Sequence, residues 1–436
     1  MPIPSGNVLV LGAYGLIGYG VTQRLLRDGF QVTGLGRDAS TAQRVLPGVP
    51  WIERDLKNLC DDANWTDILQ GVSLVVNCSG ALQDSPNDDL EALHHKAIAA
   101  LAQACAAQDV ALVQISAVGA APDAATHFMA SKGRGDAAIR AAGGSWHILR
   151  PGLVLAQNAY GGTTMIRMLA AIPWVQPLAA SDAKIQTVAL SDVANAVSAA
   201  ARGKIPFGTE LDLVEPDTHS LREVIAKMRQ WLGFRPARIE VTLPRFCLTA
   251  VSKMADALAY LGWRSPLRST ALAVLGDGVR GTATDLAQFE EPPLSSLEKT
   301  LRDMPVGVQD RLFARMTLLM PVILACLCLF WLASGTIGLF RVDAAADILR
   351  NVGWPGGLAR ASVIFWALVD IAIGVAFAFR RSAYGACWAA IGVSLFYLAA
   401  STLTVPSLWA DPLGPLVKVV PLIVLALVAR VTLDAR

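Results

Sequence analysis

Short apolar runs alternate with amphipathic stretches over the first part of the chain. Residues 8–11 are four consecutive apolar residues, and the stretch that begins at Val21 has apolar residues at helical spacing. Further strand-like runs occupy residues 30–37, 51–56, 71–80, 110–120 and 146–155. Because helical stretches separate these runs, the pattern predicts an α/β fold, in which a doubly wound parallel sheet of the Rossmann type carries helices on both faces.

The pattern changes after the sixth strand. From residue 205 to about residue 291, helical stretches mix with short strands at residues 210–214 and 238–241. We expect a small C-terminal lobe here, within a first domain of residues 1–300, and the family resemblance given below implies that this lobe holds the substrate. Residues 243–262 form an apolar helix that fits two interpretations. The helix either faces the protein core or rests on a bilayer near the mouth of the substrate site.

Four apolar stretches follow a proline-containing linker at residues 292–296. They occupy residues 316–340, 361–379, 384–405 and about 413–429. A stretch of about 20 residues suffices to cross the ~30 Å hydrocarbon core of a bilayer. We therefore expect a second domain at residues 311–436, an all-α bundle with four transmembrane spans.

Basic residues predict the orientation of this bundle. Arginines flank the predicted spans on one side, at Arg311, Arg315, Arg380, Arg381, Arg430 and Arg436. By the positive-inside rule, the N-terminal domain and the C-terminus are expected to be cytoplasmic, in an inner membrane of the bacterial type.

Two charged residues interrupt the apolar stretches. Asp370 lies near the middle of the second predicted span, and Lys418 enters the fourth. A charge in hydrocarbon is costly, and such residues usually face a partner or a pathway. Two interpretations are open: a buried structural pair, or a role in handling protons or a quinone.

Composition and charge narrow the function classes. Hydrophobic residues make up 54% of the chain and charged residues 17%, which is too apolar for a wholly soluble protein. From Arg311 onwards there are ten Lys/Arg and five Asp/Glu, a balance of +5, whereas the first 310 residues carry 27 and 30, a balance of −3. The acidic first part argues against a nucleic-acid partner. The seven cysteines lack the spacing of metal ligands, so we predict no metal site.

The first strand leads into a glycine turn. Gly12, Gly15 and Gly18 follow residues 8–11 at GxxGxxG spacing and precede a helix. Glycines at such a turn let a pyrophosphate approach the backbone N–H groups at the positive end of the helix dipole. We therefore predict a dinucleotide site, which also includes Tyr14, Leu16 and Ile17 of the same turn.

The ends of the following strands supply further candidates for the cofactor site. Arg37 ends the second strand, where an arginine accommodates a 2′-phosphate, so NADP(H) is favoured over NAD(H). Asp55 and Leu56 end the third strand, and Asp55 is placed to accept from the adenine amino group. Cys78, Ser79 and Gly80 form a small-residue turn after the fourth strand, and Ser116 ends the fifth.

These motifs together resemble the extended or atypical branch of the short-chain dehydrogenase/reductase superfamily. The amino-acid sequences of residues 115–120 and 126–132 are most similar to those of the nucleotide-binding accessory subunit of respiratory complex I and its bacterial relatives. The resemblance implies that Ser116 and Lys132 are catalytic, and that Lys132, Pro151 and Gly152 also contact the cofactor. By length and hydropathy, the membrane part resembles a DoxX-like four-helix domain.

One position departs from the superfamily pattern. The catalytic motif is Tyr-x-x-x-Lys, in which the phenol relays a proton and the lysine holds the ribose. Here Phe128 occupies the tyrosine position and has no proton to give, while Lys132 is retained. His127 and Tyr160 are conceivable substitute acids, although a structural role is the simpler interpretation of each. His94 and His95 are interpreted as ordinary helix residues.

Two functions follow from this sequence. One is an NAD(P)(H)-dependent oxidoreductase that acts on a hydrophobic small molecule of the membrane, a quinone or a lipid. The other, favoured by Phe128, is a non-catalytic NADPH-binding scaffold, assembly factor or sensor, with a partner in a membrane complex or a second copy of the chain.

Overall fold

The computed structural model describes residues 6–85, 88–263 and 265–433. The chain divides into two compact units. The first unit combines Met1–Asp256 with Ser265–Arg311, and the second combines Ala257–Arg264 with Leu312–Arg436. The end of the helix expected at residues 243–262 therefore groups with the C-terminal unit, and the division into domains of residues 1–300 and 311–436 stays a prediction.

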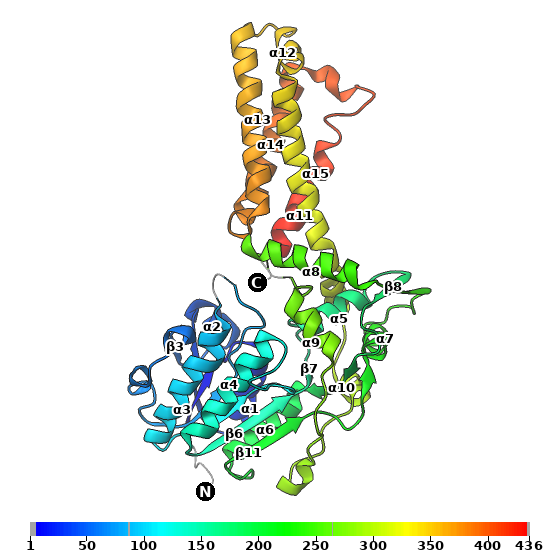
Figure 1. The fold of residues 1–436 in the computed structure, drawn as a ribbon. Helices are drawn as coiled ribbons and strands as arrows, with labels where there is room; N and C mark the ends of the chain where they lie inside the picture. The colour runs from blue at the N-terminus through cyan, green and yellow to red at the C-terminus, as the bar shows by residue number, and fades with distance from the viewer. Residues whose placement is uncertain (1–5, 86–87, 264, 434–436) are drawn as a thin grey trace. The chain divides into compact units, whose positions relative to one another are not determined.

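A seven-stranded sheet forms the centre of the first unit, in the order β11-β6-β5-β4-β1-β2-β3 (Figure 1). All its strands are parallel. They are β1 (Asn7–Leu11), β2 (Gln31–Gly36), β3 (Trp51–Glu53), β4 (Val72–Asn77), β5 (Ala111–Ile115), β6 (Trp146–Pro151) and β11 (Thr209–Leu213). The expected doubly wound α/β fold is confirmed.

Both faces of this sheet are covered, as the apolar strands require. Val8 and Val10 of β1 join one buried cluster, while Leu9 and Leu11 join another on the opposite face. The covering helices are α1 (Leu16–Arg27), α2 (Ala39–Val45), α3 (Ala97–Ala107), α4 (His127–Ala142) and α6 (Leu190–Ala201). A π-helical turn, η3 (Ala92–Lys96), leads into α3.

The second lobe begins earlier in the chain than predicted. The stretch 210–214, expected in the lobe of residues 205–291, contributes instead to the edge strand β11 of the main sheet. The lobe already includes α5 (Gly162–Ala170) and pairs β8 (Val175–Leu178) with β13 (Ile239–Thr242). The sequence pattern did not reveal the pairing of β11 with β6, because the chain leaves the sheet after β6 and returns to it only after α6.

Smaller elements complete the first unit. The short strands are β7 (Leu153–Leu155), β9 (Lys184–Ile185), β10 (Thr187–Ala189) and β12 (His219–Ser220). The remaining helices are α7 (Leu221–Trp231), α8 (Arg245–Tyr260), α9 (Ser269–Asp277) and α10 (Leu297–Asp303), and the last turn of α8 belongs to the second unit.

The second unit is helical. Among the described residues, three helices are long and apolar enough to cross a membrane: α11 (Val308–Phe340), α13 (Gly356–Ala378) and α14 (Arg380–Thr404). A short helix, α12 (Val342–Arg350), separates the first two. The fourth predicted span contains only the shorter apolar helix α15 (Val419–Leu433), because Pro412, Gly414 and Pro415 interrupt the helix on its N-terminal side. The fourth crossing stays a prediction.

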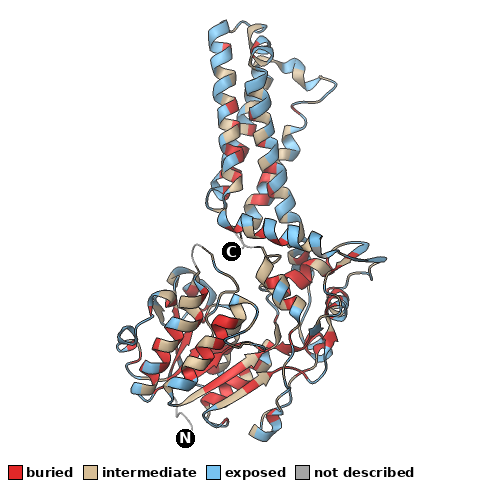
Figure 2. Ribbon diagram, viewed as in Figure 1, coloured by how far each residue is buried: buried red, intermediate tan, exposed pale blue. Residues whose placement is uncertain are grey.

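Large apolar side chains of the second unit point outward. Few residues of these helices are buried, whereas the exposed residues of the first unit surround a buried sheet (Figure 2). The helices meet through small residues, since a Cβ on Gly335 of α11 would overlap with the carbonyl oxygen of Ala367 on α13. Outward apolar surface and small residues at helix contacts are typical of membrane bundles.

Candidate functional site

The turn between β1 and α1 has the geometry of a phosphate-binding loop. Gly12 has a φ of +69°, and its N–H donates to the carbonyl oxygen of Leu35 at 2.9 Å. A Cβ on Gly18 would overlap with the carbonyl oxygen of Gly12, so α1 can approach the strand only with glycine there. Gly15, at the N-cap of α1, supplies no side-chain cap, and the first N–H groups of the helix are therefore suited to an anion.

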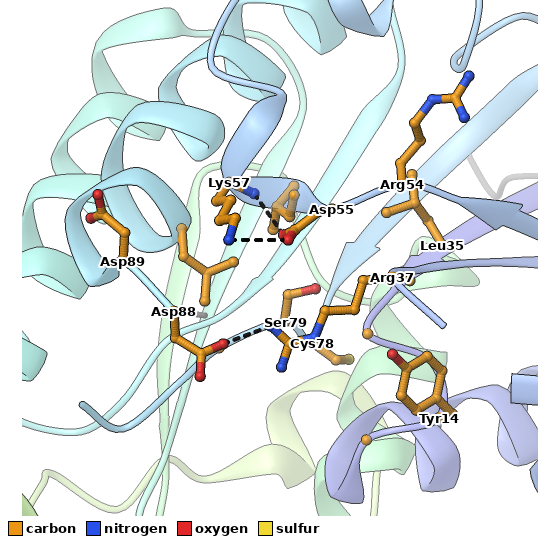
Figure 3. A pocket seen from close by; sticks show the side chains of 16 residues that line it. Tyr14, Leu35, Arg37, Arg54, Asp55, Lys57, Cys78, Ser79, Asp88 and Asp89 are labelled. Atoms are coloured by element: carbon orange, nitrogen blue, oxygen red, sulfur yellow. Dashed lines mark hydrogen bonds and ion pairs between the residues drawn. The ribbon is translucent and has the colours of Figure 1, made fainter. Parts of the chain in front are cut away.

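A pocket opens beside this turn at the carboxyl ends of the strands (Figure 3). Nine of the predicted cofactor residues line it: Gly12, Tyr14, Gly15, Arg37, Asp55, Leu56, Cys78, Ser79 and Gly80. The other predicted cofactor residues are not in this lining, namely Leu16, Ile17, Gly18, Ser116, Lys132, Pro151 and Gly152. The pocket matches the place where a dinucleotide fold holds the adenosine part of its ligand.

Charged side chains surround the adenosine end of the pocket. Arg37 forms an ion pair with Asp88, with 2.7 Å between Nη1 and Oδ1, and Lys57 lies 3.5 Å from Asp55 (Figure 3). Burial lowers the pKa of Arg37, but the hydrogen bond and the charge interaction with Asp88 outweigh this effect, so the pKa is raised overall. Asp38 caps α2 instead of facing the pocket, because it accepts from the N–H of Thr41 at 2.9 Å.

Pro151 and Gly152 hold neighbouring strands together. The N–H of Val118 donates to the carbonyl oxygen of Pro151 at 3.2 Å, and the N–H of Gly152 donates to that of Leu213 at 3.0 Å. A Cβ on Gly152 would overlap with the carbonyl oxygen of Gln186. The contacts that Pro151 and Gly152 make within the first unit are therefore with neighbouring strand ends, and their contact with the cofactor stays a prediction.

The predicted catalytic residues are buried and meet between β5 and α4. Lys132 is buried, and its Nζ donates to the carbonyl oxygen of Ile115 at 3.1 Å. Burial lowers the pKa of Lys132. Ser116 is buried beside it, and its Oγ donates to Oδ2 of Asp136 at 2.6 Å. Phe128 lies on the same helix, with 5.9 Å between its ring centroid and Nζ of Lys132.

Asp136 is a site residue that the sequence interpretation missed. It is fully buried, and its Oδ1 has no hydrogen-bond partner among the described residues. Burial raises its pKa, although the hydrogen bond from Ser116 and the charges of Lys132 and Arg150 act in the opposite direction. The signal was present in the spacing, since Lys132 and Asp136 are four residues apart on one helix and so share a face.

His94 is a second missed residue, because it was interpreted as an ordinary helix residue. The N–H of Ala81 donates to its Nε2 at 3.2 Å, so Nδ1 carries the proton and faces Oγ of Ser131 at 2.9 Å. Burial holds its pKa well below the ordinary value, which keeps the ring neutral. His94 therefore fixes the turn after β4 from the π-helical turn η3, an irregularity that is frequent at functional sites.

The two conceivable substitute acids face other groups. His127 Nδ1 lies 3.0 Å from Oδ2 of Asp84, and half of its side chain is exposed. Tyr160 is exposed, and the hydrogen bonds at this position join its backbone to Thr163. Neither geometry directs a proton toward Ser116 or Lys132.

Two family models match the chain. The first describes an NAD(P)H-binding domain and matches residues 12–202, and the second describes a DoxX-like family and matches residues 328–427. The N-terminal part is an NAD(P)-binding domain whose Rossmann fold is like that of short-chain dehydrogenases/reductases, fused to a DoxX-like domain. The Rossmann sheet and the apolar helices described above agree with both assignments.

The individual relatives of this chain are distant. A ceramide reductase of Caulobacter vibrioides is 22% identical over 291 residues, which cover 66% of this chain and 87% of that protein. The structure of WbmG of Bordetella bronchiseptica with NAD is 16% identical, with a TM-score of 0.51 over 69% of this chain and 92% of WbmG. The NADPH-dependent quinone oxidoreductase QOR2 of Escherichia coli, solved with NADPH, is 18% identical, with a TM-score of 0.51 over 68% of this chain and 98% of QOR2. These structures share the fold of the first unit.

Proposed function

We propose that the protein is an NAD(P)(H)-dependent oxidoreductase acting on a carbonyl or hydroxyl group of an apolar, membrane-soluble molecule. The observation that carries this proposal is the buried hydrogen bond between Ser116 and Asp136 next to Lys132. Burying three polar side chains is costly unless their interactions are needed. Such groups with shifted pKa values often mark a functional site.

The pair offers a replacement for the missing phenol. When bound, a reduced nicotinamide supplies a hydride to the carbonyl carbon of the substrate. In this role the hydrogen bond of the structure is reversed: Oγ–H of Ser116 turns to the carbonyl oxygen, and a protonated Asp136 donates its O–H to Oγ. As the Oγ–H bond breaks toward the carbonyl oxygen, the Asp136 proton passes to Oγ, which leaves the alcohol product and an Asp136 carboxylate. Burial raises the pKa of Asp136, which is the direction that this role requires. Lys132 orients the ribose.

We further propose that the cofactor is NADP(H). Arg37 at the end of β2 supports this preference, because a guanidinium binds a 2′-phosphate with paired hydrogen bonds. An acidic residue near this position would favour the free 2′-hydroxyl of NAD(H). Asp38 is engaged as the N-cap of α2, which removes it from that competition.

The substrate class follows from the fusion to the membrane domain. A substrate that partitions into the bilayer makes tethering useful, and the distant similarity to a ceramide reductase favours a lipid over a water-soluble sugar. We propose that the DoxX-like domain has four spans in an inner membrane of the bacterial type, with the first unit and the C-terminus in the cytoplasm. The arginines on one side of the apolar helices support this orientation.

A non-catalytic function is the second candidate, and Phe128 favours it. Its ring lies 5.7 Å from that of His94, edge to face, so the tyrosine position is filled by an apolar contact. In this case bound NADPH would stabilise or report on a membrane complex, with another protein or a second copy of this chain as the partner.

The test uses the full chain in nanodiscs loaded with NADPH. Quinones and ceramides that carry a ketone are added while the nicotinamide absorbance is followed. We expect saturable oxidation of NADPH with one of these two classes. Lys132→Met and Asp136→Asn should each lower kcat about 100-fold, the lower range for loss of an acid–base group. Lys299→Met, on the exposed surface of α10, is the matched control and should leave the rate unchanged.

Phe128→Tyr separates the two candidates. It restores the phenol at the superfamily position without removing Ser116 or Asp136. Oxidation by the unaltered protein supports the proposed relay. Turnover that appears only in Phe128→Tyr, with NADPH bound equally by both proteins, would contradict it and favour the scaffold.

A further inference from the structure

Helix α8 exposes its large apolar side chains. Phe246 is 73% exposed and Met254 61%, and Val251 and Leu258 are exposed as well. The buried positions of the helix hold small residues instead, namely Ser252, Ala255 and Ala259. The core-facing interpretation of residues 243–262 is therefore wrong, because a core helix places its large apolar residues inward.

A second exposed apolar group lies on the strand pair directly before α8. Trp174 is 66% exposed and Ile239 58%, and Val241 is exposed on the same strand as Ile239. Trp174 has a φ of +62°, an uncommon conformation for a bulky residue, and its carbonyl oxygen accepts from the N–H groups of Arg238 and Ile239. The backbone thus holds the indole at the surface, which points to a binding role for it.

The chain itself indicates what covers these side chains. The segment that follows α8 belongs to the membrane unit, where the N–H of Arg380 donates to the carbonyl oxygen of Leu261 at 2.9 Å. The indole Nε1 of Trp263 donates to the carbonyl oxygen of Ala378 at 2.7 Å. Ala378 ends α13 and Arg380 begins α14, so α8 leads into the turn between two candidate spans. Such a turn lies at the membrane–water boundary, where Trp and Arg are favoured.

We propose that six exposed residues of the first unit form a membrane-facing surface that lies in the headgroup–acyl boundary of an anionic phospholipid bilayer. This membrane-facing surface consists of Trp174, Ile239, Val241, Phe246, Val251 and Met254. Apolar and aromatic side chains on a helix that continues into a membrane domain match the composition of interfacial anchors. Arg235 and Arg238 are exposed beside the strand pair and suit anionic headgroups.

The membrane-facing surface is connected to the candidate site through Asp256 of α8. Its Oδ1 accepts from Nε2 of Gln83 at 3.0 Å, and Arg268 bridges Asp256 to the carbonyl oxygen of Asp84. Gln83 and Asp84 follow the turn at residues 78–80 that lines the cofactor pocket. A bilayer that contacts α8 would therefore affect the position of the loop at Gln83 and Asp84, next to the candidate site. The proposal does not depend on turnover, so it stands or falls separately from the proposed function.

The test is photolabelling of the full chain in nanodiscs that contain a phospholipid with a diazirine in its acyl chain. Adducts are located by mass spectrometry. We expect labelling of α8 between Phe246 and Met254 and of the peptide that carries Trp174, together with labelling of the candidate spans. Leu26 and Val45 are matched controls, because they are apolar and exposed on α1 and α2 of the same unit, and they should not be labelled.

Two further arms keep the outcome decisive. Replacing phosphatidylglycerol by phosphatidylcholine should reduce the labelling of the membrane-facing surface but not of the spans, because the attraction of Arg235 and Arg238 to the lipid is lost. The double variant Phe246→Glu/Met254→Glu should abolish labelling of α8, while Leu26→Glu should not. Labelled spans with an unlabelled α8 in the unaltered protein would overturn the proposal, as would cross-links showing that a second copy of the chain covers α8.

Discussion

The two units of this chain place their large apolar side chains on opposite sides: inward in the Rossmann unit and outward in the helical unit. In the Rossmann unit, β1 buries alternate residues on both faces of the sheet, and charged side chains remain around a pocket. In the helical unit, large residues such as Leu329 and Leu403 point outward, while small residues hold the helices together. The first arrangement suits water, and the second suits lipid, where outward apolar side chains cost nothing.

Buried polar groups differ between the units as well. The Rossmann unit concentrates Ser116, Lys132 and Asp136 at one place beside the cofactor pocket. In the helical unit, Asp370 accepts from Ser334 at 2.7 Å and from the phenol of Tyr397 at 2.8 Å. Under the proposed function, polar burial serves chemistry in one unit and helix association in the other, and the following experiments test that difference.

The largest effect is expected from a glycine-to-alanine substitution at the turn of the Rossmann unit, with a glycine in open space on the helical unit as the control. Gly18→Ala places a Cβ against the carbonyl oxygen of Gly12, and we expect it to cost about 3 kcal/mol and to abolish cofactor binding, because backbone atoms cannot move aside. Gly392→Ala on α14 meets open space and should leave stability and binding unchanged. Thermal unfolding and NADPH titration measure both. Equal effects of the two substitutions would show that the approach of α1 to Gly12 is not what requires glycine at position 18.

The next effect concerns Asp370. Asp370→Ala leaves the hydroxyls of Ser334 and Tyr397 without their acceptor, and we expect a loss of about 1–2 kcal/mol, since hydrogen bonds between membrane helices are individually modest. Asp370→Asn should recover part of this loss, because the amide oxygen still accepts. Thermal unfolding in mild detergent, followed through the helical circular-dichroism signal, provides the measurement.

Lys418 supplies the control for Asp370. The hypothesis that the two residues pair is wrong in this structure, because Asp370 is buried against hydroxyls whereas Lys418 is exposed just before α15. Lys418→Met should have no effect, and its combination with Asp370→Asn should be additive within about 0.5 kcal/mol. A larger coupling energy would mean that the two charges do meet.

The sequence predicted most of the fold because its signals are local. Four apolar residues before Gly12 suffice for a buried strand, and the long apolar stretches in α11, α13 and α14 suffice for long membrane helices. The lobe boundary failed because whether residues 209–213 join the main sheet or a lobe depends on a pairing with β6, which local hydropathy does not encode.

The candidate site was predictable only where a motif fixes it. Nine of the predicted cofactor residues line the pocket because glycine spacing and strand ends determine that edge of a Rossmann sheet. His94 was missed because its partners Ala81 and Ser131 are 13 and 37 residues away in the sequence. Asp136 was missed because its distance from Ser116, 20 residues, is bridged by the packing of α4 on β5.

A smaller effect tests whether the charged rim of the pocket serves the ligand. Arg37→Gln should weaken NADPH binding about tenfold, or about 1.4 kcal/mol, and leave NADH binding unchanged, because only NADPH carries the 2′-phosphate. Arg27→Gln, on the exposed end of α1, is the charge-matched control. Isothermal titration with both cofactors gives the answer. Equal losses for NADPH and NADH would contradict a phosphate-binding role for Arg37.

The smallest effect is a pH dependence that should appear in the Rossmann unit. Hydrogen bonds from Arg134 and then His95 lower the pKa of Glu91 to about 2, and Glu91 precedes the π-helical turn that carries His94. A depressed carboxyl pKa contributes stability above the unfolded value of about 4.3, and this contribution is lost as the pH falls toward 2. Since the pair is partly exposed, solvent screening should limit the contribution to about 1 kcal/mol.

Glu91→Gln isolates this contribution. At pH 7 the variant should be less stable than the unaltered protein by about 1 kcal/mol, and the difference should shrink as the pH falls through 4 toward 2, where Glu91 itself becomes protonated. Unfolding of the Rossmann unit is followed at each pH, and unfolding of the helical unit serves as the internal reference. A difference that is constant with pH would mean that the substitution acts through packing. In that case the charge pair would not be what holds η3, and with it His94, against α4.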